Sequence, residues 1–183
     1  VIVASMTRRV RRQSRRTEFM ALHDSLTGLP NRALHADRVS AALASAGRLG
    51  TDVALVVVDL DRFKEVNDFH GHAAGDQLLT VLGERMRTAL RPDEFVARLG
   101  GDEFVIMMEG LSLIALDAAA LARVVAEKIL EAFKEPYDLQ GTPYLCTVSI
   151  GIALFNRPTD TVEELLKQAD LAMYQAKAAG RNT

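Results

Sequence analysis

The chain has 183 residues, of which 49% are apolar and 25% charged, and its formal net charge is −2. This length fits one domain of ordinary size with a short appendage, and the composition excludes a largely disordered or low-complexity chain. Residues 1–20 hold six arginines and one glutamate, so the remainder of the chain carries a charge of −7. An acidic body argues against nucleic-acid binding by that body. The single cysteine, Cys146, is expected to be a buried core thiol, as suits a cytoplasmic protein.

Residues 1–21 are predicted to form a basic helical linker in front of a domain that spans residues 22–183. The apolar start followed by arginines is typical of a juxtamembrane helix, although no stretch of this sequence is long enough to cross a bilayer. A heptad spacing over residues 3–20 favours a coiled coil instead, and a solvated basic helix is the simplest alternative. We expect the sequence to be a piece of a longer protein.

Turn and capping residues over 24–32 separate this linker from the body. In chain order the body predicts a helix over 32–47, a strand over 52–59, a polar loop or short helical turn over 61–72, a helix over 73–90, strands over 94–99 and 102–108, a helix over 114–134, strands over 136–140 and 144–155, and a last helix that Thr161 caps and Gly180 ends. This order predicts an α+β fold with helices over a central, mainly antiparallel sheet of about five strands, plus a small hairpin.

Three acidic residues stand where predicted strands begin or end. Asp59 ends an apolar strand, and Asp102 and Glu103 follow the glycine pair of a predicted hairpin. If that hairpin pairs beside the Asp59 strand, the carboxylates converge and make a site for magnesium, which suits a protein that handles phosphates. The alternative is that these acids only cap a loop and line the surface of a hairpin.

The sequence resembles the GGDEF-domain family, the diguanylate cyclases, over about residues 22–183. The resemblance rests on six separated motifs, at residues 24–32, 59–64, 67–76, 98–104, 149–153 and 169–182. It implies a fold like that of nucleotidyl cyclases and polymerase palms. It also implies the condensation of two GTP into cyclic di-GMP and two pyrophosphates, in an active site formed between the subunits of a homodimer. The cofactor implied is Mg²⁺, with Mn²⁺ as a substitute.

The resemblance assigns metal and catalytic roles to the acidic residues. Asp59 and Asp102 would ligate the metal with help from Glu103 and the Leu60 carbonyl. Either Asp102 or Glu103 would assist loss of the 3′-hydroxyl proton, and the sequence does not choose between them.

It assigns substrate-binding roles to a second set of residues. Phosphates would be held by the backbone N–H groups of Arg62, Phe63 and Lys64 and by the side chains of Lys177 and Arg181. Guanine would be read by Asn67 and Asp76, with His72 close to the substrate and with Gly100 and Gly101 leaving room for the nucleotide. The alternatives are local: Asn67, His72 and Asp76 as capping or solvated residues, and Lys177 and Arg181 as charges that favour the end of a helix.

Two features of the resemblance leave open whether the product inhibits the protein and which domains flank this one. The inhibitory product site of many members is an Arg-x-x-Asp sequence before the glycine pair, and this chain has Arg91 and Glu94 there. A simple turn at Pro92 is the alternative. The later segments resemble GGDEF domains that precede a phosphodiesterase domain of the EAL type, so we expect an upstream sensory domain, a downstream EAL-type domain and, through an upstream segment only, a membrane tether. The alternative function is therefore a GTP- or cyclic di-GMP-sensing regulatory domain that controls an attached phosphodiesterase.

Overall fold

The computed structural model describes residues 17, 19–111, 114–139, 141–155 and 161–183. Of the predicted linker, Thr17 and residues 19–21 are helical, and the rest, with its coiled-coil and juxtamembrane interpretations, lies outside the described residues. No described helix is both long enough and apolar enough to span a membrane.

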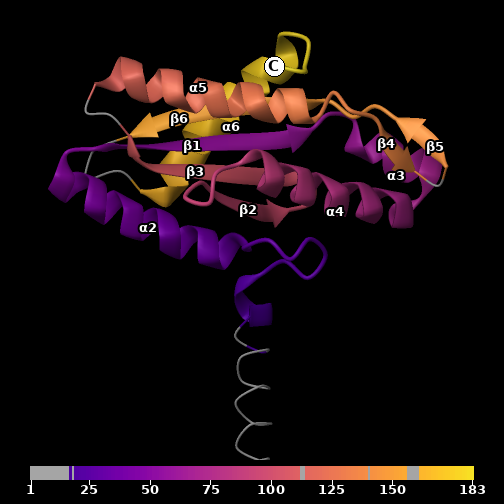
Figure 1. The fold of residues 1–183 in the computed structure, drawn as a ribbon, viewed down its shortest axis with the longest axis horizontal. Coiled ribbons are helices and arrows are strands. Elements are labelled where there is room, and N and C mark those ends of the chain that lie inside the picture. Colours follow the sequence, from indigo (N-terminus) through magenta and orange to yellow (C-terminus); the bar gives the residue numbers. More distant parts are fainter. Residues whose placement is uncertain (1–16, 18, 112–113, 140, 156–160) are drawn as a thin grey trace, which may run out of the picture.

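The helices and strands follow the predicted order closely (Figure 1). Their bounds are α2 Arg32–Leu49, β1 Asp52–Leu60, α3 Phe63–His70, α4 His72–Ala89, β2 Phe95–Gly100, β3 Glu103–Leu111, α5 Ala115–Ala132, β4 Tyr137–Leu139, β5 Thr142–Tyr144, β6 Val148–Phe155 and α6 Val162–Ala178.

The central sheet has the strand order β2-β3-β1-β6, and every neighbouring pair is antiparallel. The middle strand β1 is buried on both faces, which explains why its sequence is apolar without alternation. Its residues 54, 56 and 58 belong to a core shared with α4 and α5, whereas residues 53, 55 and 57 belong to a second core shared with α2 and α6. The fold is therefore an α+β domain with helices packed on both faces of an antiparallel sheet.

Two details differ from the sequence prediction. The central sheet of the described residues has four strands where about five were expected, and the strand predicted over 144–155 is shorter, because β6 begins only at Val148. Tyr144 belongs instead to β5, which begins within the predicted turn and pairs only with β4 as a small separate hairpin, while β6 pairs with β1. The predicted loop over 61–72 contains the eight-residue helix α3, which lies beside this hairpin at the end toward which β1 points (Figure 1).

Gly151 of β6 allows α6 to pack directly against the sheet. A Cβ at this position would lie 2.0 Å from the Ala169 carbonyl oxygen and 2.5 Å from the Met173 nitrogen, so no larger residue fits without movement of the helix. At its other end α6 begins with the predicted Thr161 cap, which forms a capping box with Glu164. This close packing positions the C-terminal end of α6 relative to β1 and β6.

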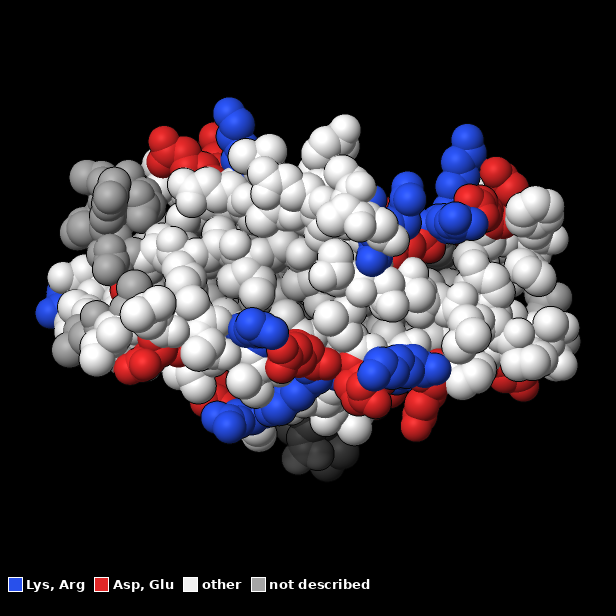
Figure 2. All heavy atoms as spheres, turned by 90° about the horizontal axis from the view of Figure 1, so that it is seen from above, with Lys and Arg blue, Asp and Glu red and all other residues white. Residues whose placement is uncertain are grey.

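Charged side chains of both signs are interspersed on the face seen in Figure 2, with uncharged residues over most of its middle. On that face the described residues form no broad basic patch of the kind that nucleic-acid binding requires. Cys146 is buried, as predicted, and burial raises the pKa of its thiol to about 12.

Candidate active site

The predicted acidic residues meet at one edge of the central sheet. Asp59, near the end of β1, is the register partner of Glu103 at the start of β3, and the Leu60 N–H donates to the Asp102 carbonyl oxygen at 3.4 Å. The hairpin therefore pairs beside the Asp59 strand, which is the condition under which the sequence predicted convergence.

The β2–β3 hairpin depends on its glycine pair. Gly100 has φ +145° and Gly101 has φ +52°, conformations that residues with a Cβ rarely adopt. Arg98 braces the turn, because its Nε and Nη2 donate to the Gly101 carbonyl oxygen at 3.1 and 2.7 Å. The Nη1 of the same guanidinium donates to Asp24 Oδ1 at 2.8 Å, which connects the hairpin to the turn before α2. The sequence prediction did not single out this brace.

Burial and mutual repulsion shape the electrostatics of the acids. Burial raises the pKa of Asp59, a hydrogen bond from Lys177 opposes this rise, and the nearby charge of Asp102 adds to it. The pKa of Glu103 is raised by burial and by the charge of Asp170, while Arg32, whose Nη2 lies 3.8 Å from Glu103 Oε2, opposes the rise. A divalent cation at this edge would relieve the repulsion.

Lys177 and Arg181 both reach this edge, but by different routes. Lys177, in the last turn of α6, places its Nζ 2.5 Å from Asp59 Oδ1. Arg181 lies beyond the last helix, since α6 ends at Ala178, and it has φ +67°. The chain turns back after Gly180, and this turn brings Arg181 Nε to 3.9 Å from Asp61 Oδ1.

The residues predicted to hold phosphate lie at the start of α3. Arg62 precedes the helix with φ +60°, and no side chain caps the N terminus of α3. Lys64 is exposed in the first turn. The uncapped N–H groups of this turn are suited to bind an anion.

The predicted guanine-reading residues lie on two successive helices that meet at Gly71. Asn67 belongs to α3 and is partly buried, whereas His72 and Asp76 belong to the first two turns of α4 and are exposed. Gly75 is an additional residue of this region that the sequence prediction missed. A Cβ there would lie 2.1 Å from Asn67 Oδ1, so the glycine leaves the space that the amide occupies.

The oxygen donors fit a hard divalent cation by type, since Asp59, Asp102, Glu103 and the Leu60 carbonyl all offer oxygen. Among the described residues, however, no group of three or more acidic, histidine or cysteine side chains is already arranged to hold a metal ion. Asp59, one of the predicted metal ligands, is instead paired with the ammonium of Lys177.

Arg91 and Glu94, the residues of the possible product site, form a turn. The Glu94 carboxylate accepts from the Arg91 N–H at 2.7 Å, and the Glu94 N–H donates to the Arg91 carbonyl oxygen at 3.0 Å. Both residues also line a surface groove of about 920 Å³ beside α2 and the turn before it. The turn interpretation describes the local structure, and product binding stays a prediction.

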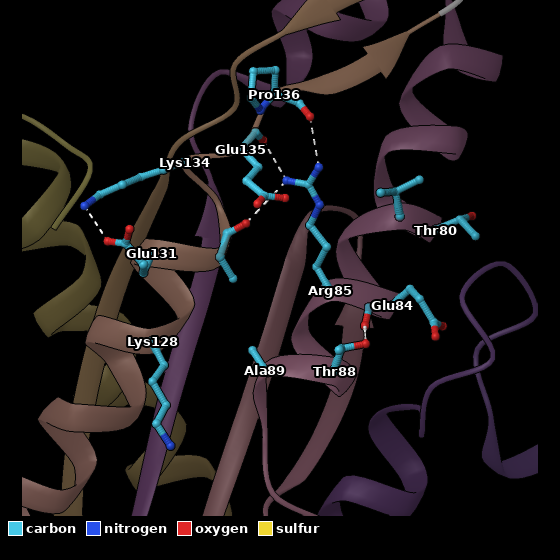
Figure 3. Close-up of a pocket in the computed structure, with 12 residues that line it drawn as sticks. Thr80, Glu84, Arg85, Thr88, Ala89, Lys128, Glu131, Lys134, Glu135 and Pro136 are labelled. Atoms are coloured by element: carbon cyan, nitrogen blue, oxygen red, sulfur yellow. Dashed lines mark hydrogen bonds and ion pairs between the residues drawn. The ribbon is translucent and has the colours of Figure 1, made fainter.

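Another groove, of about 1010 Å³, lies between α4 and α5, away from all the predicted site residues (Figure 3). Arg85 closes one end of it, where its guanidinium donates to the carbonyl oxygens of Ala132, Glu135 and Pro136 at 3.3, 2.6 and 2.9 Å. These contacts neutralise the C-terminal end of α5, so we assign Arg85 a structural role.

The chain is an antiparallel α+β domain in which acidic residues near the end of β1 and at the start of β3 meet. Comparisons with known proteins identify the family to which this domain belongs. The family model described as "Diguanylate cyclase, GGDEF domain" matches residues 21–183. The chain therefore belongs to the GGDEF-domain family, as its motifs indicated.

Individual relatives agree with this assignment. The chain is 44% identical over 171 residues to MucR of Pseudomonas aeruginosa, a bifunctional diguanylate cyclase/cyclic di-GMP phosphodiesterase. The aligned region covers 93% of this chain and 24% of MucR. The solved GGDEF domain of TpbB from Pseudomonas aeruginosa superposes with a TM-score of 0.79 at 41% identity, covering 87% of this chain and 91% of that one. The solved coiled coil and GGDEF domain of DgcB from Caulobacter crescentus, in complex with cyclic di-GMP, has a TM-score of 0.86 at 29% identity, covering 98% and 93%.

The chain thus spans about a quarter of MucR and 37% of the full-length TpbB. Membership in the family supports a role in bacterial cyclic di-GMP signalling and in cyclic di-GMP synthesis.

Proposed function

We propose that the chain is a magnesium-dependent diguanylate cyclase domain that condenses two GTP into cyclic di-GMP and two pyrophosphates. The main support is the meeting of Asp59 with Asp102 and Glu103 at a sheet edge that Lys177 and the uncapped start of α3 also border. This arrangement combines hard oxygen donors with groups that bind triphosphate oxygens.

In this proposal each subunit binds one GTP. The N–H groups at the start of α3, with Lys177 and Arg181, hold its phosphates. At the guanine edge the Asp76 carboxylate accepts from the N1–H and N2–H groups, and the Asn67 amide forms a further hydrogen bond. Asp59, Asp102, Glu103 and the Leu60 carbonyl would hold the metal, which supplies charge neutralisation at the attacked phosphorus. Asp102 or Glu103 accepts the 3′-hydroxyl proton.

The second substrate must come from another copy of the domain, because one site presents a single bound nucleotide to attack. A homodimer supplies the proximity that the reaction needs. Residues 1–21 are proposed as the linker that brings two copies together, in line with the coiled coil of the DgcB structure that matches almost the whole chain. In a longer parent protein, sensory and EAL-type domains would flank this domain on the cytoplasmic side of the membrane.

A second function, regulation of an attached phosphodiesterase through GTP or cyclic di-GMP binding, is favoured by one relative of the chain. The bifunctional relative MucR shows that cyclase and phosphodiesterase parts occur together in one such protein.

Incubation of the purified chain with GTP and Mg²⁺, followed by chromatography of the products, distinguishes the cyclase function from the regulatory function. We expect cyclic di-GMP from the wild type and none from Asp102→Asn, whose folding should be retained because Asp102 is only partly buried. GTP binding without product, even after fusion to a strong dimerisation domain, would favour the regulatory function. Activity in Asp102→Asn would contradict the assigned metal site.

A further inference from the structure

Asp61, two residues after Asp59, has a buried carboxylate that accepts three hydrogen bonds from other parts of the protein. Its side chain is 2% exposed. Oδ2 accepts from Thr147 Oγ1 at 2.7 Å and from the Asn182 N–H at 3.2 Å, and Oδ1 accepts from Ser149 Oγ at 2.7 Å. Because these donors use most of the acceptor positions of the carboxylate, Asp61 is not available as a metal ligand in this arrangement.

The segment that contributes the Asn182 N–H is conformationally strained. Gly180, Arg181 and Asn182 have φ values of +125°, +67° and +52°, and two of these residues carry a Cβ. Consecutive residues of this kind persist only when surrounding contacts hold them. The backbone contacts that hold this segment are the bonds from the Asn182 N–H to Asp61 and from the Ile150 N–H to the Thr183 carbonyl oxygen at 2.8 Å. The N–H groups of Gly180 and Arg181 also donate to the carbonyl oxygens of Lys177 and Ala176, at 3.4 and 3.1 Å.

The same carboxylate therefore joins three parts of the candidate site. It is one residue before Arg62 and the start of α3, it binds the Thr147–Ser149 region at the start of β6, and it fixes the turn after α6. The Arg181 side chain, which this turn carries, is 48% exposed, and its Nε is 3.9 Å from Asp61 Oδ1. Arg181 is thus held at the phosphate-binding end of the site with part of its guanidinium free for a ligand.

We propose that Asp61 is a positioning residue, which pins the strained turn at residues 180–183 so that Arg181 lies at the start of α3 and binds the triphosphate of the nucleotide. The substrate part of this inference rests on the proposed function, whereas the pinning of the turn does not.

Hydrogen exchange of the backbone amides tests the pinning without any turnover. In Asp61→Asn the amide group cannot accept from all three donors, so we expect exchange at Asn182 and Ile150 to accelerate by about tenfold or more, while exchange in the middle of β1 stays within about twofold. Asn182→Gly is the matched control, because glycine keeps the N–H and adopts φ +52° without strain, and it should leave exchange at Ile150 unchanged. Unaltered exchange at both amides of Asp61→Asn would overturn the proposal.

A double-mutant cycle tests whether Asp61 acts through Arg181. We expect Asp61→Asn to raise the KM for GTP about tenfold with a change in kcat of less than about threefold, and Arg181→Ala to do the same. If Asp61 acts by placing Arg181, the double variant should have a KM within about twofold of Arg181→Ala alone. Multiplied effects would instead show that Asp61 acts independently of Arg181, and would refute the positioning role.

Two further measurements separate failure of the proposed function from failure of the positioning role. If the wild type makes no cyclic di-GMP, the proposed function fails and the cycle is measured as the Kd for GTP, which still decides whether Asp61 acts through Arg181. A wild type that does not bind GTP at all refutes the proposed function and the substrate part of this inference, and hydrogen exchange still decides whether Asp61 pins the turn. If Asp61→Asn does not fold, Thr147→Val removes a donor to the same Oδ2 with little change of shape, and it should accelerate exchange at Asn182 and raise KM or Kd in the same direction, though by less. No change in either measurement for Thr147→Val would count against the proposal.

Discussion

Gly75 and Asn67 lie so close together that only glycine fits: a Cβ at position 75 would approach Asn67 Oδ1 to 2.1 Å. The contact joins α4 to α3 at the proposed guanine-reading end of the site. We therefore predict that Gly75→Ala displaces the Asn67 amide and weakens GTP binding by about tenfold, as expected for a lost and partly desolvated hydrogen bond. The Kd for GTP, compared with that for ATP, measures the effect.

Gly83→Ala is the matched control for this variant, because Gly83 lies on the same helix and a Cβ there would come no closer than 3.2 Å to the end of the Leu29 side chain and 3.4 Å to Thr27 Cβ. Both substitutions raise helix propensity equally. Equal GTP affinities of the two variants would show that the Gly75–Asn67 contact has no role in binding.

Replacement of Lys177 changes the ionisation of Asp59. Lys177 opposes the pKa rise that burial causes at Asp59, so in Lys177→Met the pKa of Asp59 rises further. A metal ligand must be ionised, and a higher pKa means that a higher pH is needed to ionise it. We predict that the acid limb of the pH–activity profile moves to higher pH and that kcat/KM at neutral pH falls about tenfold, since a phosphate contact is also lost. A profile with the wild-type acid limb would contradict the assignment of Asp59 as the ionising ligand.

The brace formed by Arg98 predicts a loss of stability. Arg98→Met removes both guanidinium donors to the Gly101 carbonyl oxygen and the charged donor to Asp24, which keeps its hydrogen bonds from Thr27. It should lower the free energy of unfolding by about 2 kcal/mol, a value discounted for partial exposure. Urea unfolding followed by circular dichroism measures this difference.

The pH dependence of the same variant gives a second readout. Burial opposes ionisation of Asp24, but hydrogen bonds from Thr27 and Arg98 outweigh it and hold the pKa of Asp24 below its ordinary value of 3.8. The stabilisation is therefore present above pH 3.8 and is lost as the pH falls through the lower, folded-state pKa. Wild type should lose more stability over this acid range than Arg98→Met, and equal losses would argue against the ion pair.

Gly151→Ala tests how tightly α6 packs on the sheet. The added Cβ would meet backbone atoms of residues 169 and 173, which cannot move without displacing the helix. We predict a loss of about 3 kcal/mol in the free energy of unfolding, measured in urea. Because displacement of α6 also moves Lys177 and Arg181, GTP affinity should fall in the same variant, and retained affinity with full stability would show that the helix tolerates the methyl group.

Much of the fold could be predicted from the sequence because local sequence patterns specify the helices, strands and turns. The apolar run of β1, the glycine pair between β2 and β3 and the Thr161 cap each specify a local structure, and each is present in the described residues. The late start of β6 at Val148 could not be predicted, because the residues from 144 onward are suited to a strand and the boundary is set by which partner strand each residue meets.

The sequence by itself determined the family, the order of the elements and the presence of acidic residues at the ends of two strands, since motifs and periodicity are local properties of the chain. Only the tertiary structure decided which atoms face each other there: the Lys177–Asp59 ion pair, the Arg98 brace, the space that Gly75 leaves for Asn67, and the pinning of the 180–183 turn by Asp61. These contacts join residues far apart in the chain, and their geometry depends on strand register and on the close approach of helices to the sheet, which no local pattern specifies.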